Sequence, residues 1–124
     1  MKTVLVTGGC GCLGSWVIKL LIEKKDKVIC LDTSSNINRL KLILDENYLK
    51  KISFNNIDIF DFKNINKLIK KEKINFIVHL AAFQVPFVKS NPILGSRVNV
   101  EGTVVLYECA VKNKNQIEGF VSGS

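Results

Sequence analysis

The residues that point most directly to chemistry are three glycines near the N-terminus. The segment Thr7–Gly14 reads TGGCGCLG and places Gly8, Gly11 and Gly14 between an apolar run and an amphipathic stretch. Because glycine has no Cβ, these positions permit a tight turn, a close approach of the backbone to a phosphate, and close packing of a helix on a sheet. A helix that starts here directs its free N–H groups at an anion. We therefore expect these glycines to bind a pyrophosphate.

An acidic residue at the end of the next apolar run supports this interpretation. Asp32 stands eighteen residues after Gly14, and a carboxylate at this place accepts hydrogen bonds from the ribose hydroxyls of an adenosine. The carboxylate also repels a 2′-phosphate, so NAD is favoured over NADP, with Arg39 as a competing feature that would reach such a phosphate. The alternative, glycines that serve only a tight turn, is disfavoured because the glycine spacing and the acid agree.

Short β-branched runs alternate with amphipathic stretches along the whole chain. The predicted strands are Thr3–Thr7, Lys27–Leu31, Ile52–Ile57, Phe76–Leu80 and Gly119–Ser122. Such alternation implies parallel strands joined by right-handed crossovers. We predict an α/β fold, a Rossmann-type doubly wound parallel sheet in which five strands are present and the C-terminal part is missing.

Four predicted helices connect these strands, each with apolar residues at three- and four-residue spacing. Their predicted buried faces are, in chain order, Leu13, Val17, Leu20 and Leu21; Ile37, Leu40, Ile43 and Leu44; Ile65, Leu68 and Ile69; and Leu94, Val98, Val105, Leu106 and Cys109. Asp61 is the predicted N-cap of the third helix. The fourth is predicted to start near Asn91–Pro92, with Asn as its cap, and to run to about Lys112.

Composition narrows the classes of protein. The chain has 124 residues, about one domain, of which 47% are apolar and 23% charged, and this excludes a disordered chain. No apolar run approaches the roughly 20 residues that span a bilayer, so we expect no membrane partner and a cytoplasmic location. The net charge of +7 comes from scattered lysines without interleaved aromatic residues, which disfavours nucleic acid. The four cysteines and single histidine lack zinc spacing, so no metal is expected.

Four further motifs follow the glycine loop in order. They are DIFD at Asp58–Asp61, HLAA at His79–Ala82, NVEGT at Asn99–Thr103 and FVSGS at Phe120–Ser124. With the glycine loop they resemble the extended short-chain dehydrogenase/reductase family, the NAD-dependent epimerases and dehydratases. The resemblance covers essentially the whole chain. It implies that residues 1–124 are an N-terminal fragment, an incomplete NAD(P)-binding Rossmann domain without its substrate domain.

The resemblance also implies roles for single residues. Besides the three glycines and Asp32, it gives as cofactor-binding residues Cys12, Leu13, Asp58, Ile59, Leu80, Ala81, Ala82, Asn99 and Ser122. The segment 58–59 would flank the adenine, and the segment 80–82 would line the ribose on the nicotinamide side. Ser124 aligns with the catalytic residue that hydrogen-bonds the substrate hydroxyl or carbonyl.

Some of these residues have structural alternatives. Asp58 would instead cap a turn, and His79, alone at a strand end, is interpreted as structural rather than catalytic. Asn99 lies among valines, where a buried amide finds partners either in the cofactor or in backbone groups. Cys10 and Cys12 keep the turn feasible, and their thiols would be activated near a helix N-terminus, but the sequence assigns them no function.

Two departures from the family pattern limit the functional prediction. The family's Tyr-x-x-x-Lys, in which lysine lowers the pKa of the tyrosine acid or base, is absent from this chain, so we expect the chain alone to lack catalysis. Phe83–Pro92 is more apolar than its family counterpart, which argues against a charged sugar nucleotide near it. The chain also stops directly after its fifth predicted strand, and we expect the isolated product to expose apolar surface and dissolve poorly.

Two functions stay open for the full-length protein. The first is a homodimeric epimerase, dehydratase or dehydrogenase that acts on a sugar nucleotide or related secondary alcohol by hydride transfer to nicotinamide. The alternative is a non-catalytic dinucleotide-binding sensor or regulator of the same fold. A Tyr-x-x-x-Lys after Ser124 would distinguish them; the substrate is not encoded in these residues.

Overall fold

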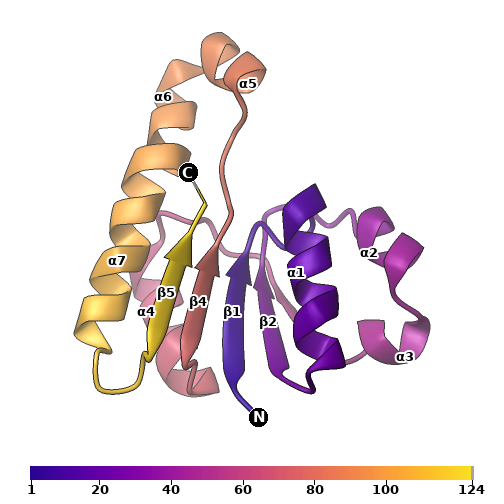
Figure 1. Cartoon of the computed structure of the whole chain (residues 1–124). Coiled ribbons are helices and arrows are strands. Elements are labelled where there is room, and N and C mark those ends of the chain that lie inside the picture. The colour runs from indigo at the N-terminus through magenta and orange to yellow at the C-terminus, as the bar shows by residue number, and fades with distance from the viewer. Residues whose placement is uncertain (124) are drawn as a thin grey trace.

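A five-stranded parallel sheet lies between two layers of helices (Figure 1), in a computed structural model that describes residues 1–123. The strands are β1 (Thr3–Thr7), β2 (Lys27–Leu31), β3 (Ile52–Asn55), β4 (Phe76–His79) and β5 (Gly119–Ser122). They pair in parallel in the order β3-β2-β1-β4-β5. This confirms the predicted Rossmann-type doubly wound sheet. Two predicted strands end earlier than expected, β3 at Asn55 and β4 at His79.

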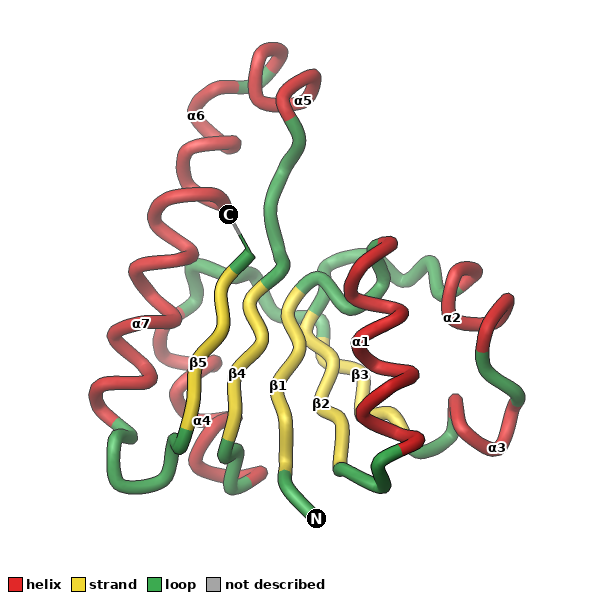
Figure 2. Tube along the Cα trace, in the orientation of Figure 1, coloured by secondary structure: helices red, strands yellow, loops and turns green. Residues whose placement is uncertain are grey.

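The sheet is buried on both faces, as the continuous apolar runs predicted. In β1, Leu5 packs into one core, while Val4 and Val6 pack into the other, because successive side chains point to opposite faces. Helices α1 (Cys12–Glu23) and α2 (Asn38–Ile43) cover the second of these faces, and α4 (Phe62–Glu72) and α7 (Gly102–Lys112) cover the first (Figure 2).

The predicted buried face of the first helix is half right, because Val17 and Leu21 pack against the core but Leu13 and Leu20 do not. Leu13 and Leu20 are 70% and 57% exposed, whereas Ile18 and Ile22 are buried in the core. Apart from Lys19 and Glu23 the helix is apolar on most of its circumference, so periodicity alone selects its buried face poorly. Gly14 selects it, because a Cβ there would overlap the carbonyl oxygen of Gly8. Its neighbours one and two turns on, at positions 18 and 22, therefore face the sheet.

The other predicted helix faces are largely confirmed. Leu40 and Leu44 are buried in and after α2, and Ile65, Leu68 and Ile69 are buried in α4. Asp61 caps α4, since its Oδ1 accepts a hydrogen bond from the backbone N–H of Asn64 at 3.2 Å. Two short helices, α3 (Glu46–Leu49) and α5 (Val85–Ser90), were not predicted.

The predicted fourth helix is one long helical segment with a π-helical turn inside it. It comprises α6 (Pro92–Ser96), the turn η1 (Arg97–Glu101) and α7 (Gly102–Lys112). The Asn91 side chain accepts from the N–H of Leu94 at 3.3 Å, which confirms the predicted cap. Its predicted core residues Leu106 and Cys109 are fully buried. Across the residues that the structure describes, none of the helices is long and apolar enough to cross a membrane.

Candidate functional site

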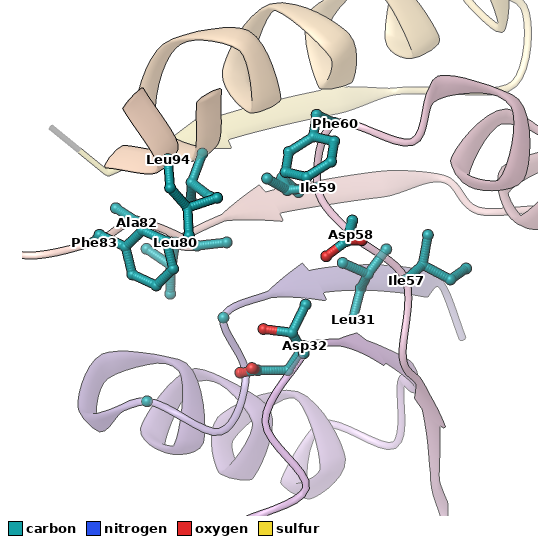
Figure 3. A pocket seen from close by; sticks show the side chains of 15 residues that line it. Leu31, Asp32, Ile57, Asp58, Ile59, Phe60, Leu80, Ala82, Phe83 and Leu94 are labelled. Atoms are coloured by element: carbon teal, nitrogen blue, oxygen red, sulfur yellow. The ribbon is translucent and has the colours of Figure 1, made fainter. Parts of the chain in front are cut away.

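A cavity of about 390 Å³ opens at the carboxyl ends of the central strands. It lies where strand order reverses, with β2 on one side of β1 and β4 on the other, which is the place where open α/β sheets bind ligands. Its volume falls within the range typical of small-molecule sites. Five segments form its walls (Figure 3): Gly8 and Gly11; Leu31–Thr33; Ile57–Phe60; Leu80–Phe83; and Leu94 with Val98.

The glycine loop shows a backbone requirement at its first glycine. Gly8 has a φ of +69°, in the region that residues with a Cβ rarely adopt. A Cβ there would also lie 2.8 Å from the backbone nitrogen of Ala81. The loop closes through a hydrogen bond from the N–H of Gly11 to the carbonyl of Gly8 at 3.1 Å, and α1 begins at the next residue. This compact turn therefore brings a helix N-terminus to the rim of the cavity.

The carboxylate of Asp32 is held in place by backbone groups on two sides. Its Oδ2 accepts from the N–H of Cys10 at 3.0 Å, and its Oδ1 accepts from the N–H of Ser34 at 2.9 Å. Asp32 lines the cavity beside Asp58 (Figure 3). It also lines a neighbouring polar hollow that includes Arg39, the residue expected to compete for a 2′-phosphate. Asp32 thus belongs to the wall that the main cavity shares with the hollow containing Arg39.

The segment after β3 forms the wall next to Asp58. The carbonyl of Asp58 accepts from the N–H of Asp61 at 2.9 Å, so this residue both lines the cavity and closes a turn. Ile59 is 5% exposed and packs so tightly on Gly102 that a Cβ at that glycine would overlap its side chain. Phe60 carries the guanidinium of Arg97 on its ring, 4.0 Å from the ring centroid.

The loop after β4 forms the opposite wall and is held by two side chains. Thr7 Oγ1 accepts from the N–H groups of Leu80 and Ala81, both at 3.1 Å. Asn99 donates from Nδ2 to the carbonyl of Phe83 at 2.9 Å and accepts at Oδ1 from the N–H of Phe83 at 2.7 Å. Both ends of this amide are therefore occupied by backbone groups, which is the alternative that the sequence left open.

The structure brings eight of the predicted cofactor residues to the cavity: Gly8, Gly11, Asp32, Asp58, Ile59, Leu80, Ala81 and Ala82. Five do not line it: Cys12, Leu13, Gly14, Asn99 and Ser122. Cys12 and Leu13 are exposed at the start of α1, Gly14 packs under the glycine loop, and Ser122 ends β5. The predicted catalytic Ser124 lies outside the described residues.

Sequence reasoning missed seven residues of the wall: Leu31, Thr33, Ile57, Phe60, Phe83, Leu94 and Val98. Five of them are direct chain neighbours of predicted residues, so extending each motif by one or two positions finds them. Leu94 and Val98 were predicted as core residues, and nothing in their local sequence signals that they face a cavity.

Cys10 of the glycine loop and Cys30 of β2 are packing groups, whereas Cys12 is exposed. Cys10 and Cys30 are buried, and burial raises the pKa of both thiols, so they stay protonated at neutral pH. Among residues 1–123, no group of three or more histidine, cysteine or acidic side chains is placed to hold a metal ion.

His79 is likewise structural in its contacts. It is 3% exposed, its Nδ1 lies 2.7 Å from Thr7 Oγ1, and its Nε2 lies 2.9 Å from Thr103 Oγ1. Burial lowers its pKa, which favours the neutral imidazole.

A glycine loop and a clamped acid at the switch point of a parallel sheet define a Rossmann-type domain of the dinucleotide-binding class. A family model described as GDP-mannose 4,6 dehydratase matches residues 5–124. The chain thus belongs to the family of NAD-dependent epimerases and dehydratases, as its motifs predicted.

Known proteins of this family resemble the chain over nearly its whole length. The UDP-glucose 4-epimerase of Schizosaccharomyces pombe is 30% identical over 125 residues, which cover 98% of this chain and 34% of that protein. The UDP-glucose 4-epimerase of Thermotoga maritima, solved with UDP-glucose, matches with a TM-score of 0.81 and 27% identity, over 99% of this chain and 38% of that one. The Thermus thermophilus UDP-glucose 4-epimerase, solved with NAD, has the same fold at 24% identity and a TM-score of 0.75. The match covers 91% of this chain and 35% of that one. The chain therefore spans about a third of the length of these relatives.

Proposed function

We propose that this chain binds NAD in the cavity and is the cofactor-binding part of a longer enzyme that acts on a sugar nucleotide. The observation that carries the proposal is the Asp32 carboxylate, fixed by the N–H groups of Cys10 and Ser34 directly beside the glycine loop. An acid held in this way presents its remaining acceptor capacity to a pair of ribose hydroxyls.

The residues present fit a dinucleotide. The absence of a Cβ at Gly8 lets the backbone of Leu80–Ala81 pack against the glycine loop, and the start of α1 offers N–H groups to the pyrophosphate. Asp58 and Ile59 would flank the adenine, while Leu80–Ala82 would line the ribose of the nicotinamide half. Bound NAD supplies a hydride acceptor; these side chains bind and orient it and exclude water around it.

Charge supports NAD over NADP. Asp32 lines both the cavity and the neighbouring hollow that contains Arg39, so its carboxylate would repel a 2′-phosphate placed there. Because the two backbone N–H groups fix the carboxylate, it does not swing away to admit the phosphate.

Catalysis and substrate belong to the longer protein. The relatives named above are epimerases of UDP-glucose by their names, and the chain spans about a third of their length. We propose a sugar nucleotide as substrate and Ser124 as the residue that binds its reacting hydroxyl or carbonyl. The chain alone, without Tyr-x-x-x-Lys, would bind cofactor but not turn over substrate. A cytoplasmic location stays a prediction.

A homodimer through helices of this domain is part of the proposal. Val100, Val104, Tyr107 and Val111 form an exposed stripe along η1 and α7, with exposures between 49% and 63%. Their spacing of three and four residues places them on one helix face. An apolar stripe of this kind is typical of an interface between helices.

Calorimetric titration of the 124-residue chain with NAD tests the proposal. We expect saturable binding with one site per chain and affinity for NADP at least about tenfold weaker. A folded chain that binds neither dinucleotide would overturn it. Sequencing the reading frame beyond codon 124 distinguishes the enzyme from the sensor. An enzyme encodes Tyr-x-x-x-Lys there, and a sensor lacks it.

A further inference from the structure

A chain of buried and partly buried hydrogen bonds connects β1 through β4 to the long helical segment. We propose that His79 and Thr103 are positioning residues which, through Asn99, fix the backbone of Leu80–Phe83 as one wall of the cavity. The inference rests on the proposed function only where it assigns this wall to the nicotinamide half of NAD.

The direction of these hydrogen bonds follows from Thr7. Its Oγ1 already accepts from the N–H groups of Leu80 and Ala81. A hydroxyl oxygen has two acceptor positions, so its own hydrogen points to the remaining neighbour, Nδ1 of His79 at 2.7 Å. The imidazole is therefore the neutral form that carries its proton on Nε2.

The chain continues to the helical segment in the same direction. The Nε2–H of His79 donates to Thr103 Oγ1 at 2.9 Å, and the Thr103 hydroxyl donates to the carbonyl of Asn99, also at 2.9 Å. His79 and Thr103 thus each donate one hydrogen bond and accept one, while Thr7 donates one and accepts two. Protonating His79 would put a second hydrogen between Nδ1 and Thr7 Oγ1, where the chain has no acceptor for it.

The chain ends at the backbone carbonyl of Asn99, and the side-chain amide of the same residue holds the loop. Asn99 lies in the π-helical turn η1, and turns of this kind are frequent at functional sites. Its amide makes two hydrogen bonds to the backbone of the single residue Phe83, at 2.7 Å and 2.9 Å. Thr7 holds the start of the loop and Asn99 holds its end, and the pair His79–Thr103 connects these two anchors.

Thr103 gives the sharpest test because two substitutions separate shape from hydrogen bonding. Thr103→Val keeps the branched shape and removes the hydroxyl, whereas Thr103→Ser keeps the hydroxyl. Amide hydrogen exchange is measured on the 124-residue chain for Phe83, in the loop, and for Ile29, at the centre of the sheet. We expect Thr103→Val to accelerate exchange at Phe83 about tenfold more than at Ile29, the size of one lost hydrogen bond, and Thr103→Ser to restore it.

A general loss of stability would accelerate hydrogen exchange at the amides of Phe83 and Ile29 by the same factor. Equal acceleration at Phe83 and Ile29, or no acceleration at Phe83, would overturn the positioning role. This readout needs no cofactor, so it decides the role of the pair even where the proposed function fails.

A comparison of NAD with ADP-ribose tests whether the wall formed by Leu80–Phe83 contacts the nicotinamide half of NAD. ADP-ribose has the adenosine and pyrophosphate of NAD but lacks nicotinamide. We expect Thr103→Val to weaken NAD about tenfold and to leave ADP-ribose within about twofold. Equal weakening of both ligands would contradict the assignment to the nicotinamide half. A wild-type chain that binds neither ligand would contradict the proposed function instead.

Discussion

The α-carbon of Gly14 lies so close to the carbonyl oxygen of Gly8 that a Cβ at position 14 would overlap it. This contact ties the first turn of α1 to the end of β1. It brings the helix N-terminus to the rim of the cavity and turns Ile18 and Ile22 toward the sheet. One glycine thus determines both the packing of a helix and the shape of the candidate site.

Substitution of this glycine is therefore expected to affect stability and cofactor binding together. Gly14→Ala forces the loop away from the helix and should lower the free energy of unfolding by about 1–3 kcal/mol, as overpacking does. NAD affinity, measured by calorimetry, should fall with it. Gly11→Ala is the matched control for stability alone, because its Cβ would lie 3.2 Å from the same oxygen and needs a smaller shift, while Gly11 itself lines the cavity. A Gly14→Ala chain as stable and as tight-binding as the parent would contradict this account.

Asp32→Asn is expected to relax the choice of cofactor. The amide keeps one acceptor oxygen for two backbone N–H groups and removes the charge that repels a 2′-phosphate. The ratio of NAD to NADP affinity should narrow about tenfold, the size of one charge-assisted hydrogen bond. Asp45→Asn is the control, since Asp45 also accepts a backbone N–H, from Tyr48 at 3.0 Å, but does not line the cavity. An unchanged ratio in Asp32→Asn would show that the acid does not select the cofactor.

His79 predicts a loss of stability in mild acid. Burial lowers its pKa below the ordinary 6.5, so the unfolded chain binds this proton more readily than the folded one. Its contribution is complete above about pH 6.5 and is lost as the pH falls through the lowered folded pKa. Urea unfolding from pH 8 to pH 5 should show this decline in the free energy of unfolding. The His79→Gln chain should be less stable at pH 8, and its free energy of unfolding should change less with pH over this range.

Other groups act in a different window. The lowered pKa of Glu72, held by its hydrogen bond with Lys27, affects stability below its ordinary value of 4.5. His79 is the one histidine of the sequence. Identical slopes for the wild type and His79→Gln between pH 5 and pH 7 would therefore rule out the buried neutral imidazole.

Truncation on the buried side of α1 should lower stability far more than truncation on its exposed side. Ile18→Ala removes a fully buried side chain and should cost about 2–5 kcal/mol of unfolding free energy. Leu20→Ala removes a side chain that is 57% exposed and should change stability by at most about 0.5 kcal/mol. Urea denaturation measures both. Comparable losses would mean that α1 faces the sheet with the side the sequence pattern favoured.

The sequence predicted what depends on local pattern. The strands follow from β-branched runs, and the caps Asp61 and Asn91 follow from side chains that accept nearby N–H groups. Position in the tertiary structure is harder to predict. Leu94 and Val98 reach the cavity because the long helical segment passes behind it, and no local pattern distinguishes them from core residues. The centre of the buried face of α1, Ile18 and Ile22, was missed for a related reason, since the contact of Gly14 with Gly8 orients the helix and the apolar pattern does not.

The most direct test of NAD binding at this site is a map of backbone amide shifts in the 124-residue chain as NAD is added. We expect saturable shifts in three segments that meet only in the fold: Gly8–Leu13, Asp32–Thr33 and Leu80–Phe83. We expect none in the distant helix α3. Shifts scattered over the lysine-rich surface, or none at a large excess of NAD, would contradict NAD binding at this site.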